Sequence, residues 1–103
     1  MRTPIGPGSW PRYLGSGWRS LLDDLHRELL RLDPDCSIFE ARSAADGALE
    51  LRFYAPLRVA DQANVLVKET VATSRTVCEG CGDRGRLYGG PWCVTLCSNC
   101  APR

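Results

Sequence analysis

The stretch Val-Cys-Glu-Gly-Cys-Gly at residues 77–82, with its counterpart Cys-Ser-Asn-Cys at residues 97–100, decides how the end of this chain folds. Each stretch contains a Cys-x2-Cys pair, and the separation of the two pairs is typical of a zinc site. Two cysteines on one tight turn direct both sulfurs to the same side, and a glycine at position 82 lets the chain reverse. Two such turns complete a tetrahedron of sulfurs around one zinc ion. The predicted ligands are Cys78, Cys81, Cys97 and Cys100.

The segment between the two pairs is typical of a short β-hairpin. Residues 86–88 and 92–96 predict two strands, and the Gly-Gly-Pro sequence at 89–91 predicts the turn between them. We therefore expect a zinc ribbon over residues 76–103. Four thiolate ligands leave no position for water or substrate, so the zinc is expected to be structural rather than catalytic.

Three other uses of paired cysteines compete with zinc. A disulfide scaffold requires an oxidising compartment, and no leader sequence is expected because the first residues carry several prolines and no apolar run. A thioredoxin-like redox site requires a larger βαβ fold. An iron–sulfur cluster is also compatible with four thiolates. Two cysteines lie outside the motif: Cys93 is expected to be a small buried residue, with a substitute ligand as the alternative, and Cys36 has no assigned role.

Upstream of the ribbon, apolar residues recur with helical spacing over residues 18–33, which predicts an amphipathic helix. Ser20 and Asp23 resemble a capping box, so the regular part is expected to begin near Leu21. Leu30, beside His26, lies off the main apolar stripe. We expect it to widen the buried face, and a partner contact is the alternative. Before the helix, residues 1–17 are expected to form an irregular arm that Trp10, Tyr13 and Leu14 pin to the core, and a frayed terminus is the alternative.

The middle of the chain predicts a hairpin followed by a second helix. Residues 37–42 and 48–54 are typical of strands, and an Asp-Gly pair at 46–47 marks the turn. Residues 58–74 fit either a helix or a strand, because an apolar helical face coexists with many β-branched residues. We expect a helix. The predicted fold is α+β, with an arm (1–17), a helix–hairpin–helix core (18–75) and the ribbon.

Composition limits the function. The chain has 103 residues, a formal charge of +1 and no apolar run long enough to cross a membrane. Loading four thiolates with zinc changes the charge to about −1, so a strongly basic nucleic-acid binder is not indicated. No paired carboxylates, phosphate loop or nucleophile partner for the single histidine stands out. We therefore expect no enzyme, and neither a membrane nor a small-molecule substrate as partner.

Several motifs together resemble a group of small bacterial and phage proteins without an assigned activity. The shared features are Gly17-Trp18 leading an amphipathic helix, the Leu-Arg-Phe-Tyr strand at 51–54, and the Cys-x-x-Cys-Gly ribbon at 78–82. The resemblance covers most of residues 17–100. It implies a bacterial or phage cytoplasmic setting and a regulatory or host-modulating role, such as inhibition of a defence or transcription complex.

The expected mode of action is binding to another protein through the ribbon hairpin. Tyrosine, tryptophan and arginine are the residue types enriched at interface hot spots. The alternative is nucleic-acid binding, with arginines on phosphate and aromatic rings stacked on bases. The predicted partner-binding residues are Arg84, Arg86, Leu87, Tyr88 and Trp92.

Overall fold

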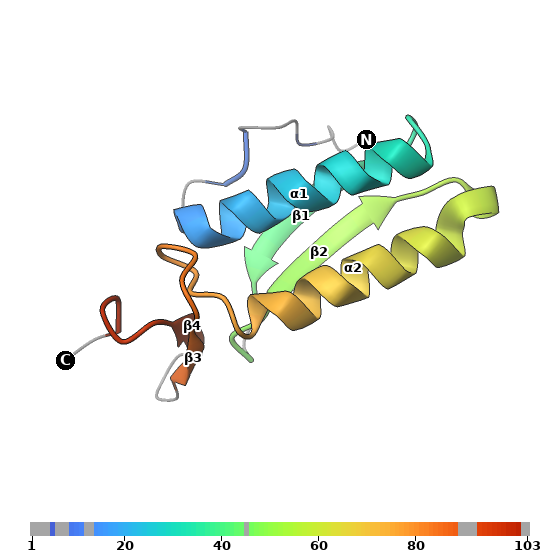
Figure 1. Ribbon diagram of the computed structural model, residues 1–103. Helices are drawn as coiled ribbons and strands as arrows, with labels where there is room; N and C mark the ends of the chain where they lie inside the picture. The colour runs from blue at the N-terminus through green and yellow to red at the C-terminus, as the bar shows by residue number, and fades with distance from the viewer. Residues whose placement is uncertain (1–4, 6–8, 12–13, 45, 89–92, 102–103) are drawn as a thin grey trace.

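The computed structural model describes residues 5, 9–11, 14–44, 46–88 and 93–101. Figure 1 shows an α+β arrangement that confirms the predicted order of helix, hairpin and second helix, followed by two short strands in the segment that carries the clustered cysteines. The elements are α1 (Ser16–Leu32), β1 (Ser37–Ser43), β2 (Leu49–Tyr54), the 3-10 helix η1 (Leu57–Val59), α2 (Ala60–Ser74), β3 (Arg86–Tyr88) and β4 (Val94–Leu96). Among the described residues, no helix is long and apolar enough to cross a bilayer.

Helix α1 begins earlier than its sequence predicts. It starts at Ser16 after Gly15, so Ser20 and Asp23 lie inside the helix and form no capping box. No side chain caps its first turn. The helix ends at Leu32, in line with the Asp-Pro stop signal, and the backbone N–H of Asp33 donates to Leu29 O. Hydrogen-bond acceptors for the first turn of α1 must therefore come from another part of the chain.

The buried face of α1 is narrower than expected. Its leucines and Trp18 enter the core, but Leu30 is 42% exposed, so the expectation that it widens the buried face is wrong. The arm packs against α1 nearer the start of the helix. Trp10 is buried, its ring meets His26 edge-on at 6.0 Å between centroids, and its indole N–H donates to Asp23. Leu14 is also fully buried, so the described part of the arm is pinned to the core, while Tyr13 lies outside the described residues.

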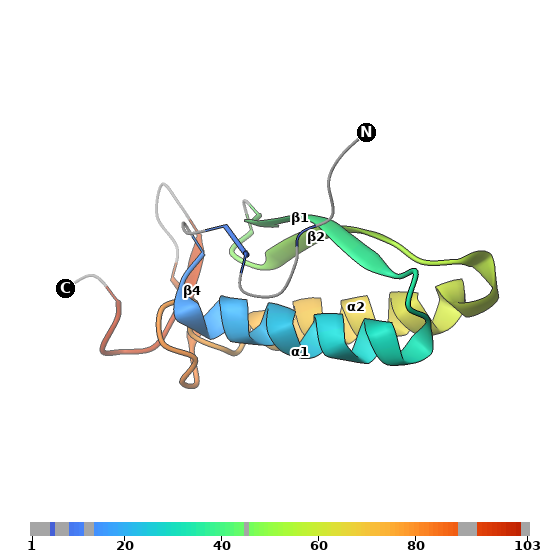
Figure 2. The same cartoon turned by 90° about the horizontal axis from the view of Figure 1, so that it is seen from above.

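The two-stranded sheet has one apolar and one charged face. Strands β1 and β2 pair antiparallel, with an irregularity between Ile38 and Glu40. Figure 2 shows α1 and α2 on the same side of the hairpin. The side chains buried against them include Ile38, Ala41 and Leu49. Glutamates and arginines alternate on the open face, where Arg42 and Glu50 pair at 2.9 Å.

The segment after the hairpin is a helix, as expected from its apolar helical face and despite its β-branched residues. Ala63 and Val67 are buried against the core, and Val59, Leu66 and Val71 are partly buried there. The end of α2 is tied to β2, because the buried Ser74 hydroxyl accepts the Leu49 N–H at 3.0 Å and donates to Val71 O. The core is therefore one layer of two helices on one hairpin.

Candidate metal centre and adjoining groove

The four cysteines predicted as ligands come together in space. Their sulfur atoms all lie within 4.8 Å of one another, and the Cys81 and Cys97 sulfurs are 3.6 Å apart. A tetrahedral site with zinc–sulfur distances near 2.3 Å requires sulfur–sulfur separations of about 3.8 Å. A disulfide requires about 2.05 Å. The cluster therefore matches a site that could hold a metal ion, and its cysteines are free thiols.

Tight turns present the sulfurs, as the sequence predicts. In the first turn the Gly82 N–H donates to Cys78 O, and Gly82 has a φ of +89°, which favours glycine. In the second, the Ala101 N–H donates to Cys97 O. Strands β3 and β4 pair antiparallel between the turns, with Leu87 opposite Thr95. Residues 89–92, where a glycine turn and Trp92 are predicted, lie outside the described residues.

The electrostatics of the cluster favour deprotonation of one cysteine and disfavour further deprotonation of the cluster. Burial raises the pKa of Cys78, but backbone N–H groups of Cys97, Cys81 and Gly80 hydrogen-bond to its sulfur and bring the pKa to about 6. The neighbouring thiols Cys97, Cys78 and Cys81 raise the pKa of Cys100 to about 12. Thiolates crowded together repel one another, and a bound cation removes that penalty.

The first cysteine turn also completes helix α1. The Gly17 N–H donates to Glu79 O at 3.1 Å, and the Ser16 hydroxyl donates to Gly80 O. The Trp18 indole N–H donates to Val77 O at 3.1 Å. A Cβ on Gly17 would lie 2.0 Å from Cys78 O, so only glycine permits this approach. The ribbon therefore supplies the cap that explains why α1 starts at Ser16.

The other side of the ribbon rests on the turn of the core hairpin. The fully buried Thr95 donates its hydroxyl hydrogen to Gly47 O at 2.9 Å. Its own carbonyl accepts the Glu79 N–H. Gly47 has a φ of +84°, and a Cβ there would lie 2.5 Å from the Leu87 side chain. Strand β4 therefore links the cysteine turn to the β1–β2 turn.

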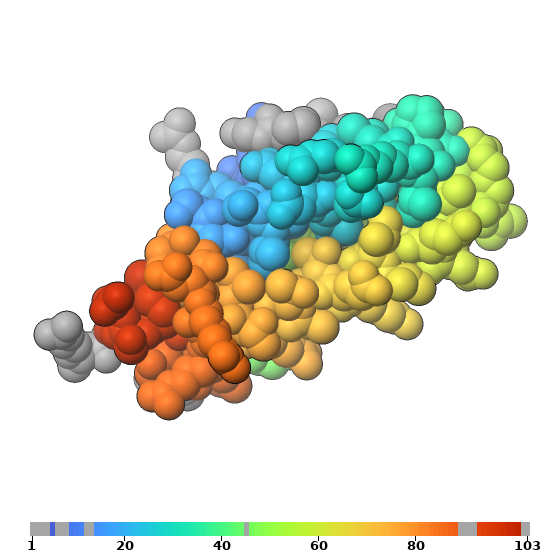
Figure 3. All heavy atoms as spheres, viewed as in Figure 1, coloured from blue at the N-terminus to red at the C-terminus, as the bar shows by residue number. Residues whose placement is uncertain are grey.

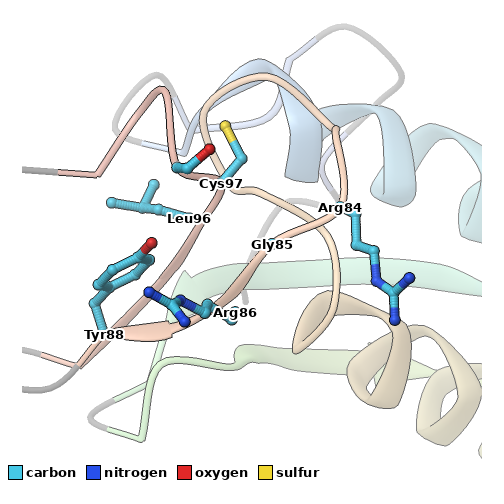
Figure 4. Close-up of a pocket in the computed structure, with 7 residues that line it drawn as sticks. Arg84, Gly85, Arg86, Tyr88, Leu96 and Cys97 are labelled. Atoms are coloured by element: carbon cyan, nitrogen blue, oxygen red, sulfur yellow. The ribbon is translucent and has the colours of Figure 1, made fainter.

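A groove of about 450 Å³ opens beside the cysteine cluster. Figure 4 shows Tyr88, Arg86 and Leu96 gathered along one part of it, with the Arg84 side chain directed away from them. The Arg86 guanidinium lies over the Tyr88 ring, 5.0 Å from its centroid, in a cation–π contact. Ser98 completes the polar lining.

The predicted partner surface is divided by the structure. Arg84, Arg86 and Tyr88 line the groove, whereas Leu87 borders a separate hollow with Asp46, Arg75 and Thr95. Alternation along β3 explains this division, because successive side chains point to opposite faces. Trp92 lies outside the described residues, so its predicted role stays a prediction.

Sequence reasoning missed several residues that build this region. Leu96 and Ser98 line the groove, and Gly15 and Gly17 provide the flat surface on which the cysteine turn sits. A Cβ on Gly15 would lie 2.2 Å from Glu79 O. Two glycines at a helix start were a usable signal, since glycine inside a helix is costly unless a close approach needs it.

The two remaining cysteines lie outside the cluster. Cys93 is half-buried next to β4 and is not one of the four clustered sulfurs. Cys36 is buried, and burial together with the nearby Asp33 and Asp35 raises the pKa of its thiol. This environment keeps Cys36 a neutral, unreactive thiol.

No family model, curated protein or solved structure matches this chain. The leading helix and the clustered cysteines of the motif-based resemblance are present in the structure, and the bacterial or phage grouping stays a prediction.

Proposed function

We propose that this chain is a zinc-ribbon binding protein without catalytic activity, in which a structural zinc ion orders a surface for another protein. The observation that carries the proposal is the convergence of four cysteine sulfurs within 4.8 Å. Zinc is the metal proposed because an all-thiolate tetrahedron is typical of structural zinc sites. Reduced thiols and bound zinc fit the cytoplasm of a bacterium or of a phage-infected cell.

The metal assignment is tested by elemental analysis of protein purified without chelators. We expect about one zinc per chain, following the one-ion stoichiometry of a four-cysteine site. Cys97→Ser should lose the zinc, and Cys93→Ser is the matched control that should retain it, because Cys93 lies outside the cluster. Equal zinc content in the two variants, or wild-type protein with oxidised cysteine pairs, would contradict the ligand assignment.

The groove is the proposed contact surface. It presents an arginine stacked on a tyrosine, and both residue types are enriched at interface hot spots. A regulatory or host-modulating role follows from this mode of action, since the chain would act by occupying a partner. Affinity capture from bacterial lysate should lose a specific partner on Arg86→Glu. Arg27→Glu, a similarly exposed change on α1, should not affect capture.

Nucleic-acid binding is the second candidate, because none of the described residues that line the groove with Arg84 and Arg86 is a carboxylate. The near-zero net charge weighs against it, since phosphate neutralisation dominates such affinities. Titration of a single-stranded oligonucleotide at low and high salt separates the two candidates. Binding that weakens steeply with salt and is lost on Arg86→Glu would favour nucleic acid as the partner. The absence of binding at low salt would exclude nucleic-acid binding.

A further inference from the structure

A second surface lies away from the ribbon, in a trench between the two helices. Figure 3 shows this furrow between α1 and α2 on the face opposite the sheet. The trench has a volume of about 210 Å³. Its floor is apolar, since Leu21 and Leu66 are only half-buried and Leu25 lies beneath them. Its lining spans two helical turns on each helix, about 10 Å.

The rim of the trench is acidic on both sides. Asp24 and Glu28 occupy successive turns of α1, Glu69 faces them from α2, and no basic residue of the described ranges lines the trench. Arg27 and Arg31 pair with the α1 carboxylates at 3.6 and 3.0 Å from the outer side of the helix. These arginine side chains are 64% and 69% exposed and do not line the trench, and exposed pairs of this kind are weak enough to exchange partners. Glu69 forms no ion pair within the described part of the chain.

We propose that this trench is a docking site for a basic amphipathic helix of a partner protein. An apolar floor between carboxylate rims is complementary to a helix with leucine-like anchors at i, i+3, i+4 and i+7 and with lysine or arginine beside them. The small Thr70 and Thr73 side chains on the α2 wall leave room for such anchors.

The charge of the trench is opposite to that of the ribbon groove. Within the part of the chain that the structure describes, the ribbon groove carries arginines and no carboxylate, whereas the trench carries three carboxylates and no arginine or lysine. Nucleic acid and acidic segments are repelled by the trench. The trench contains none of the clustered cysteines, so its role is independent of the function proposed for the ribbon.

The test uses the metal-loaded full chain and three synthetic helical peptides. One carries leucines on a single face and lysines elsewhere, one has the same composition with the leucines scattered, and one replaces lysine by glutamate. Backbone amide spectra locate binding, and fluorescence anisotropy gives the affinity. We expect the first peptide alone to bind and to shift the amides of Leu21, Leu66 and Thr70.

Charge reversal at the rim gives the matched control. Glu69→Lys should weaken binding about tenfold, because a favourable contact becomes a repulsive one. Asp61→Lys makes the same charge change on an exposed position of the same helix and should leave the affinity within about twofold. Equal losses in both variants, equal binding of the scattered or acidic peptide, or shifts confined to residues 84–88 would overturn the proposal. Concentration-dependent shifts of trench amides in the protein alone would overturn it in favour of a second copy.

Discussion

The core and the ribbon of this molecule are stabilised in different ways. The core buries a continuous set of large apolar side chains from both helices and the hairpin. The described ribbon has strands of three residues, and its fully buried side chains are Cys78 and Thr95. Apolar burial stabilises the first region, whereas the second has few buried apolar side chains, backbone contacts with the core, and a cysteine cluster that could hold a metal ion. The contrast teaches that most of the core can be stabilised by its own apolar contacts, whereas the first turn of α1 depends on contacts with the cysteine turn.

The largest difference in stability between the core and the ribbon is expected on metal removal. Metal binding contributes about 10 kcal/mol to the folding of small zinc modules, so a strong chelator should unfold residues 76–101. The amide exchange protection of α2 and the hairpin should persist, while Trp18 and the first turn of α1 lose protection because their partners lie in the cysteine turn. Hydrogen exchange followed by NMR measures this residue by residue. Unchanged ribbon amides after complete metal removal would show that the two regions do not differ in this way.

Gly17→Ala tests the contact between the regions. Inside an isolated helix this change stabilises by about 1 kcal/mol. Here the new Cβ would lie 2.0 Å from Cys78 O and 2.4 Å from Gly82 N, so we expect destabilisation by about 3 kcal/mol. Chemical denaturation gives the value. Ser20→Ala, an exposed position on the same helix, is the control and should be neutral or slightly stabilising.

A smaller effect is expected where β4 meets the β1–β2 turn. Thr95→Val keeps the shape of the side chain but removes its hydrogen bond to the buried Gly47 carbonyl. The loss should be about 1 kcal/mol. Thr76→Val removes an exposed hydroxyl contact with Thr73 O and serves as the comparison in the same denaturation experiment. Equal midpoints for the two variants would mean that the turn does not support the ribbon.

The smallest effect concerns the charged face of the core. The hydrogen bond from Arg42 holds the pKa of Glu50 below its usual value of 4.5. A lowered pKa contributes stability that is present above pH 4.5 and is lost as the pH falls through the folded-state value. Wild type should therefore exceed Glu50→Gln slightly in melting temperature at about pH 7, and the difference should vanish near about pH 3. A difference in melting temperature between wild type and Glu50→Gln that does not change with pH would show that the substitution acts through packing and not through the charge of Glu50.

The sequence predicted the parts of the fold that follow from local periodicity. The apolar spacing of Leu22, Leu25 and Leu29 located α1, and the spacing of the cysteines located their cluster. The start of α1 could not be predicted, because its cap comes from the Glu79 carbonyl rather than from a nearby side chain. Leu30 was misjudged because its sequence neighbourhood does not reveal that Trp10 packs against His26, one turn earlier, and that Leu30 itself stays 42% exposed.

The candidate sites were predictable to different degrees. Alternation along β3 could have separated Leu87 from Arg86 and Tyr88, since it requires only the period of a strand. The acidic trench was not predictable, because Glu69 joins Asp24 and Glu28 only after the two helices pack antiparallel. The spacing of cysteines along the sequence is enough to predict a metal site. A surface formed between two helices can be predicted only when the packing of the helices is known.

The carbonyl that caps α1 has a consequence for the order of events during synthesis. The indole N–H of Trp18 donates to the carbonyl of Val77, which is synthesised 59 positions later, so this hydrogen bond cannot form before then. The opening turn of α1 can therefore be completed only after the cysteine turn that follows Val77 has been synthesised. A chain in which the cysteine turn has not yet formed would leave the first turn of α1 without its carbonyl partners, so that turn would open more readily than the rest of the helix.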